Sequence, residues 1–195
     1  EESGKPAVGC RFAELGTRLS LDGAKLKRIA EGWLPILYHP GRAEEIWGDD
    51  LRAGYADRAD DLGPMDVAAG GLLAIGSEDE VAGIRDFARG MVALYVGGMG
   101  ARGKNFYNTL FQRYGYVEEA KLIQDLYLDG KKAEAAAAVP AEFLEKTSLC
   151  GDEGYVRDRI AEYKASGVTV LNVTPVAPDL AGQQRLLEKV KELSD

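Results

Sequence analysis

The chain has 195 residues, 46% hydrophobic and 29% charged, a composition typical of one ordinary soluble globular domain with its own core. The net charge of −8 argues against general affinity for nucleic acid or anionic membranes. Cys10 and Cys150 are too few and too far apart for a disulfide framework, so we expect a reducing cytoplasm. No apolar run is long enough to span a bilayer.

Apolar runs predict the strands of a parallel sheet. The clearest are Gly32–Tyr38, Met65–Ile75 and Val168–Pro175, and Ala7–Ala13 is a shorter candidate. Pro35 cannot donate to a β-ladder, so it should mark a strand end or an edge. The runs are nearly continuous in apolar residues, as in parallel strands that are covered on both faces. Their alternation with helical patterns indicates βαβ units.

Helical periodicity fills the segments between these runs. Ser77 followed by Glu80 has the pattern of a capping box and predicts a helix start. We expect a turn at Ser148–Asp152. The predicted helices cover residues 41–59, 77–95, 105–114, 117–128, 132–139, a short segment after 140, 153–165 and 180–193. The helical block between the second and third clear strands is longer than one crossover and is therefore an insertion.

A glycine-rich corner at Gly97–Asn108 opens this insertion. It combines four glycines with Arg102, Lys104 and Asn105 just before a predicted helix. Exposed backbone N–H groups at a helix start favour anions, so the corner could bind a phosphate or carboxylate. The alternative is a helix connector whose basic side chains point into water. The glycines do not follow a strand, which argues against a dinucleotide-binding fingerprint.

The sequence contains no metal-ligand cluster and no nucleophile with a paired base. We therefore predict neither a metal site nor a catalytic residue within this chain. Asn172 is polar within an apolar strand, and a structural hydrogen-bond partner is the favoured explanation.

Several stretches together resemble the luciferase-like monooxygenase superfamily, and within it the branch of oxidoreductases that use the deazaflavin coenzyme F420, which is common in actinobacteria. The stretches that carry the resemblance are Gly32–Pro35, Ala93–Gly100, Lys104–Asn108, Ile123–Gly130, Ala138–Pro140 and Gly167–Pro175. They occur in the family's order, and the resemblance extends from about Gly32 to about Val176.

The resemblance implies an α/β fold, namely the carboxyl-terminal part of a (β/α)8 TIM barrel, from about strand five to strand eight. Residues 1–195 would form a single partial barrel domain, with a helical insertion at 97–150 between the last two strands. Because the chain begins at Glu1 rather than Met, we expect a fragment, a processed chain or an incomplete gene model. The family's first four strands supply most contacts to the deazaflavin ring, so this chain alone should lack a complete active site.

The resemblance also implies site residues at the carboxyl ends of the strands, where barrel active sites lie. Gly16 and Thr17 could contact the coenzyme phosphate or ribityl chain, or could form an ordinary turn. Tyr38 and His39 could form a substrate-side wall, although His39 could equally be a surface residue before Pro40. The predicted coenzyme contacts are Gly16, Thr17, Arg102, Lys104 and Asn105, and the predicted substrate contacts are Tyr38 and His39.

The expected function is hydride transfer between coenzyme F420 and a small organic substrate. One alternative is a luciferase-like monooxygenase that uses FMN. The other is a non-catalytic remnant that acts as an assembly or binding module, because half a barrel leaves sheet edges and apolar faces uncovered. We expect neither nucleic acid nor membrane as a partner. We expect either a homo-oligomer or pairing with the missing half of the barrel.

Overall fold

The computed structural model describes residues 13–14, 31–58, 60 and 62–194. The predicted strand at Ala7–Ala13 lies outside these residues except for its last position. That position belongs to β1 (Ala13–Glu14), which pairs with the next strand.

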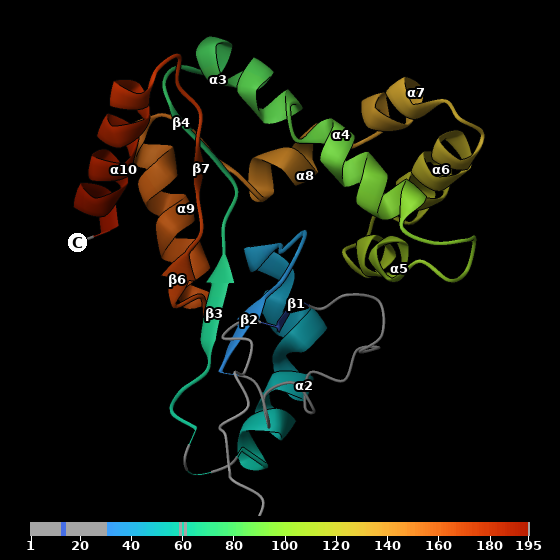
Figure 1. Ribbon diagram of the computed structural model, residues 1–195, viewed down its shortest axis with the longest axis horizontal. Helices are drawn as coiled ribbons and strands as arrows, with labels where there is room; N and C mark the ends of the chain where they lie inside the picture. Colours follow the sequence, from blue (N-terminus) through green and yellow to red (C-terminus); the bar gives the residue numbers. More distant parts are fainter. Residues whose placement is uncertain (1–12, 15–30, 59, 61, 195) are drawn as a thin grey trace, which may run out of the picture.

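All the described strand pairs are parallel, as the alternating pattern predicted. One sheet has the order β1–β2–β3–β6, and the other has the order β5–β4–β7. Because β4 directly follows β3 and β7 directly follows β6, the two sheets are the successive halves of one bent layer (Figure 1). The strands are β2 (Gly32–Leu34), β3 (Asp66–Ala69), β4 (Leu72–Ile75), β5 (Leu149–Gly151), β6 (Val170–Leu171) and β7 (Thr174–Pro175).

The run predicted as one strand at Met65–Ile75 is broken into β3 and β4 at Gly70 and Gly71. A Cβ atom on Gly70 would lie 2.1 Å from the Asn172 carbonyl oxygen, and one on Gly71 would lie 2.3 Å from that of Thr147. The layer can bend here because glycine lets neighbouring backbone approach this closely. The prediction for Pro35 is confirmed, since β2 ends at Leu34.

The turn predicted at Ser148–Asp152 is wrong, because Leu149–Gly151 forms β5. This strand pairs with β4, and its Leu149 and Cys150 are fully buried. Three residues are too few to show a strand period, and their pairing partner is distant in the sequence. In the first sheet β3 lies between β2 and β6, and in the second β4 lies between β5 and β7. β5 therefore takes the place next to β4 that β2 takes next to β3.

The helices follow the predicted segments with one main difference. The helix expected at 77–95 is three segments, the last of them a π-helical turn. The predicted capping box of Ser77 and Glu80 is confirmed. The helical elements are η1 (Pro40–Arg42), α2 (Ala43–Ala56), α3 (Glu78–Asp86), α4 (Arg89–Ala93), η2 (Leu94–Gly98), α5 (Phe106–Arg113), α6 (Val117–Leu128), α7 (Lys132–Ala137), α8 (Ala141–Lys146), α9 (Glu153–Ala165) and α10 (Leu180–Ser194).

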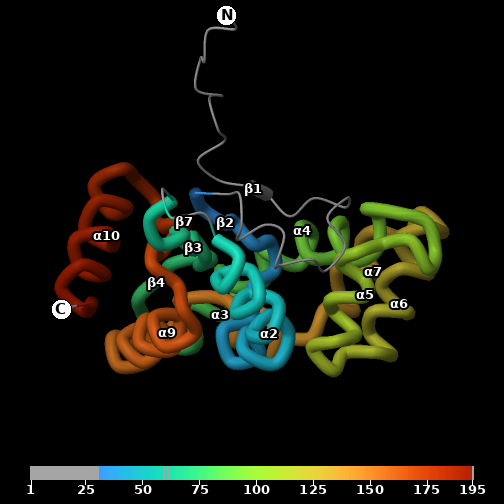
Figure 2. The backbone as a smooth tube through the Cα atoms, turned by 90° about the horizontal axis from the view of Figure 1, so that it is seen from below, coloured from blue at the N-terminus to red at the C-terminus, as the bar shows by residue number. Residues whose placement is uncertain are grey.

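The helices form three groups around the bent layer. α9 and α10 lie along one flank, whereas α5, α6 and α7 gather beyond the opposite flank (Figures 1 and 2). α3, α4 and α8 lie beyond the carboxyl ends of β2 and β3 (Figure 1). One hydrophobic core runs from Trp33 on β2 to Phe111 on α5, so sheet and insertion pack as one body. Within the described residues, none of the helices has the length and apolar character needed to cross a bilayer.

Candidate functional site

A cavity of about 300 Å³ lies where β2 ends, at the bend between β3 and β4. The turn after β2 forms one wall, α3 and α4 form another, and the segment from α8 to β5 forms a third. Its lining residues are Leu34–Tyr38, Ala68–Leu72, Arg85, Phe87, Ala88, Met91, Val92, Phe143, Leu144, Thr147, Ser148, Asn172 and Thr174. The cavity therefore opens beyond the ends of parallel strands, where α/β proteins place their ligands.

Most of this lining is apolar, and Arg85 is the one charged residue in it among the described residues. The Arg85 side chain is buried and forms an ion pair with Glu78 at the start of α3. Ser148 is also buried, and its hydroxyl oxygen has no hydrogen-bond partner among the described residues. A mainly apolar cavity with a few polar groups is typical of a small-molecule site.

The turn after β2 contains backbone strain. Leu37 has a φ of 58°, in the left-handed region that non-glycine residues rarely adopt. The Tyr114 hydroxyl on the insertion donates a hydrogen bond of 3.0 Å to the Leu37 carbonyl oxygen and helps to hold this conformation. Such strain costs about 1–3 kcal/mol and gathers at binding sites.

Tyr38 lines the cavity, but its hydroxyl is directed elsewhere. The hydroxyl lies 3.0 Å from both the carbonyl oxygen and the Oγ atom of Ser166, beyond the end of α9. Burial raises the pKa of the Tyr38 phenol, so it stays protonated. Only the rest of this side chain is available as a cavity wall.

His39 faces a different pocket from Tyr38. It is 8% exposed, and with Arg42 and Lys146 it lines a pocket between η1 and the insertion. Burial, followed by the positive charges of Arg159 and Arg42, lowers the pKa of His39 to about 4. The imidazole is therefore neutral at physiological pH, and the structure does not bring the two predicted substrate contacts together.

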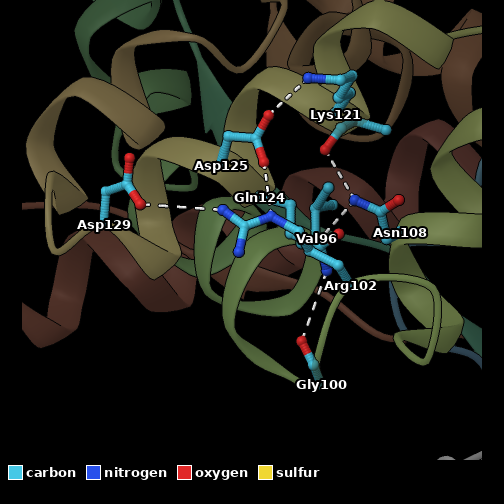
Figure 3. A network of polar contacts seen from close by, with 9 residues as sticks. Val96, Gly100, Arg102, Asn108, Lys121, Gln124, Asp125 and Asp129 are labelled. Atoms are coloured by element: carbon cyan, nitrogen blue, oxygen red, sulfur yellow. Dashed lines mark hydrogen bonds and ion pairs between the residues drawn. The ribbon is translucent and has the colours of Figure 1, made fainter.

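The glycine-rich corner places its two cations differently. The Arg102 Nε atom donates to Asp125 Oδ1 at 2.8 Å, and a second guanidinium nitrogen lies 3.8 Å from Asp129 Oδ1 (Figure 3). Lys104 is exposed and has no ion-pair partner within the described part of the chain. Neither residue lines the cavity beyond β2.

Asn105 is the buried N-cap of α5. Its Oδ1 accepts from the backbone N–H groups of Tyr107 and Asn108, and its amide nitrogen donates to the carbonyl oxygens of Tyr95 and Val96 at 2.9 Å. These bonds fill both donor positions and both acceptor positions of the side chain. They also cap the helix start that was predicted to bind an anion, so a ligand would have to displace one of them.

Gly97 and Gly98 of this corner serve helix packing. A Cβ atom on Gly97 or on Gly98 would lie 2.5 Å from the side chain of Tyr127 on α6. The close approach of the π-helical turn to α6 requires glycine at both positions. The close approach that the sequence indicated is therefore to a neighbouring helix.

The remaining sequence expectations divide in two. Gly16 and Thr17 lie outside the described residues. Asn172 is exposed at the cavity and has no side-chain hydrogen bond among the described residues, so the expected structural partner is wrong. Its position on β6–β7 is open rather than buried, which removes the need for a partner.

Sequence reasoning missed Arg85 and Ser148. One signal was available for Arg85, which comes four residues after Val81 and so lies on the same, apolar face of α3. Ser148 gives no such signal, because the sequence around it predicts an exposed turn. No group of three or more His, Cys, Asp or Glu side chains suited to a metal ion occurs in the described portion of the chain.

Comparisons with known proteins agree with this architecture. The sequence profile of the luciferase-like monooxygenase family matches residues 25–170. The chain is 32% identical over 182 residues to a Mycobacterium tuberculosis protein named, provisionally, as a coenzyme F420-dependent oxidoreductase. That alignment covers 87% of this chain and 50% of the relative.

Two solved structures share the fold. The coenzyme F420-dependent tetrahydromethanopterin reductase of Methanopyrus kandleri has a TM-score of 0.59 and 24% identity, over 94% of this chain and 47% of that one. An F420-dependent secondary alcohol dehydrogenase, solved with an F420–acetone adduct, has a TM-score of 0.56 and 12% identity, over 94% and 48%. The chain thus spans about half the length of the relatives it matches. Its family profile and its parallel α/β layer together place this chain in the luciferase-like monooxygenase family.

Proposed function

We propose that this chain forms the carboxyl-terminal half of a coenzyme F420-dependent oxidoreductase that transfers a hydride between the deazaflavin and an organic substrate. In this proposal β1, β2, β3–β4 and β6–β7 correspond to barrel strands five to eight, and 97–150 is the insertion before the last strand. The three relatives named above are each named for dependence on F420, which supports this choice of coenzyme.

The observation that carries the proposal is the cavity at the carboxyl ends of the strands. Its apolar wall, formed by Leu34, Ile36 and Met91 among others, suits the face of a planar ring. The exposed side chains of Asn172 and Thr174 at its edge offer hydrogen bonds to polar atoms of such a ring. The residues present therefore fit one part of the coenzyme and a small substrate beside it.

The coenzyme, when bound, supplies the hydride chemistry. The chain's own residues contribute binding, orientation and the exclusion of water. Leu37 is held in its strained conformation by Tyr114, so the turn after β2 is a pre-formed wall. Tyr38 reinforces the same wall through its hydrogen bonds to Ser166.

Four residues remain candidates for contact with the coenzyme tail. Lys104 is the best placed of them, because its ammonium group is exposed and has no described counter-ion. Arg102 would have to exchange Asp125 for a ligand anion. Gly16 and Thr17 keep their predicted role at the phosphate. The polar groups of Asn105 are already satisfied, so its role is to cap α5.

The test is a fluorescence titration of the purified chain with oxidised F420, with FMN as the matched comparator. Because this chain would supply only part of the site, we expect weak but saturable binding of F420, with a preference over FMN. A Lys104→Ala variant should bind F420 more weakly still. A preference for FMN would favour the FMN-dependent alternative. Failure to bind either molecule would reject the proposal in favour of a binding module.

The binding-module alternative rests on a separate observation. Apolar side chains are left exposed from the end of α3 to the start of η2 (Phe87, Met91 and Leu94) and on β6 (Val170). A second chain or a further part of a barrel could cover them. Sedimentation of the chain distinguishes the alternatives. Concentration-dependent association without coenzyme binding would favour the module, and a stable monomer would count against it.

A further inference from the structure

Arg85 is a buried cation in a mainly apolar cavity. It is 7% exposed, and no other charged side chain among the described residues lines the same space. Moving a guanidinium out of water is costly unless its N–H groups are satisfied. The buried guanidinium therefore needs an anionic partner, supplied either by the protein or by a ligand.

The anion present within the protein is a weak match. Glu78 accepts a hydrogen bond from one terminal nitrogen of Arg85, and its own side chain is 68% exposed. A guanidinium carries five N–H donors in a planar fork, and one exposed carboxylate oxygen uses one of them. Within the described residues, the Nε atom and the other terminal nitrogen of Arg85 have no recorded partner. The ion pair therefore occupies one terminal nitrogen of Arg85 and leaves the other N–H donors of the guanidinium available to a ligand.

Ser148 adds a second polar group to the same cavity wall. It is 5% exposed, and its hydroxyl lacks a hydrogen-bond partner in the described structure. Buried hydroxyls are normally paired, so one without a partner beside a cavity indicates a ligand or a bound water. Thr147, its neighbour, donates its own hydroxyl to the Phe143 carbonyl oxygen at 2.7 Å and is already satisfied.

We propose that this cavity binds a carboxylate carried on an apolar body, with Arg85 as the residue that selects the anionic head group and Ser148 as an accessory donor. The apolar body would contact Ile36, Phe87 and Met91. The inference rests on the proposed function in one respect: it takes the cavity to be the substrate side of the site. It names the substrate class as small apolar carboxylic acids.

The first experiment compares phenylacetate with its neutral isostere phenylacetamide, using calorimetry or ligand-observed NMR on the full chain without coenzyme. We expect phenylacetate to bind about tenfold more tightly, the value of one charge-assisted hydrogen bond. Arg85→Met should abolish this preference while retaining binding of the amide. Equal affinities of the wild-type chain for acid and amide would overturn the proposal.

A matched variant on the partner residue separates ligand binding from a purely structural ion pair. Glu78→Gln leaves the guanidinium in place and removes the competing carboxylate, so we expect phenylacetate to bind as tightly as before or more tightly. If Arg85 only holds α3 together, Glu78→Gln and Arg85→Met will lower stability equally and change neither affinity. This measurement also remains informative if Arg85→Met fails to fold.

Ser148→Ala gives a smaller test of the accessory donor. We expect a loss of two- to fivefold in phenylacetate affinity without loss of stability, because the variant removes a buried hydroxyl that has no described partner. An unchanged affinity would remove Ser148 from the proposal.

The source of the anion is settled by adding coenzyme. If F420 binds without displacing phenylacetate, the Arg85 position belongs to the substrate, as proposed. If F420 displaces phenylacetate and itself binds more weakly to Arg85→Met, the position belongs to an acidic group of the coenzyme and the substrate assignment is overturned. A chain that fails to bind F420 but still prefers the acid over the amide would reject the proposed function and leave the carboxylate site standing.

Discussion

The glycine-rich corner before α5 and the cavity beyond β2 use arginine in opposite ways. Arg102 is half-exposed and lies between the carboxylates of Asp125 on α6 and of Asp129 just after it, with Lys121 paired to Asp125 (Figure 3). Arg85 is buried and has one exposed partner. In sequence the corner resembles a binding site, but its Arg102 is paired within the insertion, and Lys104 alone lacks an ion-pair partner among the described residues. The sequence of the cavity wall contains no recognisable motif, yet its Arg85 has one ion-pair partner where Arg102 has two.

The same contrast extends to packing. The insertion buries Phe111 completely against Tyr116 and Phe143, with ring centroids 4.9 and 4.7 Å apart. The cavity wall leaves Phe87 70% exposed on the helix turn after α3. A region whose apolar side chains are buried and whose polar groups are paired has a structural role. A region with exposed apolar side chains and unpaired buried polar groups is suited to bind a ligand or a partner.

The largest expected effect comes from exchanging one phenylalanine in each region. Phe111→Ala should lower the free energy of unfolding by about 3–5 kcal/mol, because it empties a fully buried ring site. Phe87→Ala, the same exchange on the exposed wall, should cost less than about 0.5 kcal/mol. Urea denaturation of both variants provides the measurement. Equal losses of unfolding free energy in the two variants would contradict the proposed difference in packing between the insertion and the cavity wall.

The next effect concerns the cap of α5. Asn105→Ala removes four hydrogen bonds of a buried side chain, so we expect a loss of about 2–3 kcal/mol. Ser77→Ala, at the exposed capping box of α3, is the control and should cost about 1 kcal/mol. Thermal unfolding followed by circular dichroism measures both. A loss for Asn105→Ala no greater than that for the control would leave Asn105 available for a ligand.

Acid should act through His39. Its pKa is lowered to about 4 in the folded chain, so between pH 6.5 and pH 4 the unfolded chain binds more protons, and stability falls as the pH decreases. Allowing for solvent screening, the loss attributable to His39 is about 2 kcal/mol at pH 4. Arg159, Arg42 and Lys146 are the cations that face the ring.

The control for this pH effect is His39→Gln, which cannot titrate at this position but retains all the other titratable groups of the chain. The difference in unfolding free energy between the variant and the wild-type chain should change over pH 4–6.5 and stay constant above pH 7. A difference that is flat over the whole range would show that His39 keeps an ordinary pKa.

The smallest effect belongs to Arg102. Its bonds to Asp125 and Asp129 are solvent-exposed, so Arg102→Gln should cost less than about 1 kcal/mol, and the cost should shrink at 1 M salt. Denaturant titrations at two salt concentrations provide the test. A loss that does not depend on salt would mean that packing by the Arg102 stem, rather than its charge, holds the corner.

The sequence predicted the regular parts of this fold. Helical periodicity located α6 and α9 at their observed bounds, and Ser77 with Glu80 marked the start of α3. It failed where the outcome depends on contacts between distant segments. The bend at Gly70 depends on the carbonyl oxygen of Asn172, and β5 depends on pairing with β4. Local patterns carry no information on such contacts.

The site was less predictable than the fold for the same reason. The family resemblance indicated the carboxyl ends of the strands, and Tyr38 does line the cavity that lies there. It could not show that His39, the next residue, faces another pocket after the strained turn at Leu37. It also drew attention to conspicuous charges in the glycine-rich corner. Arg85 lies in a helix whose other residues gave no functional signal.

The pairing of β5 with β4 has a consequence for how this fold can be altered. The inserted helices end by contributing three residues to the ladder beside β4, in register with Leu73, Ala74 and Ile75. Cutting the segment out and rejoining its ends would leave those three positions with unpaired backbone groups next to the cavity. The inserted segment is therefore part of the sheet through β5. A version of this fold with a shortened or transplanted insertion must keep Leu149–Gly151 or replace it with another strand that pairs with β4.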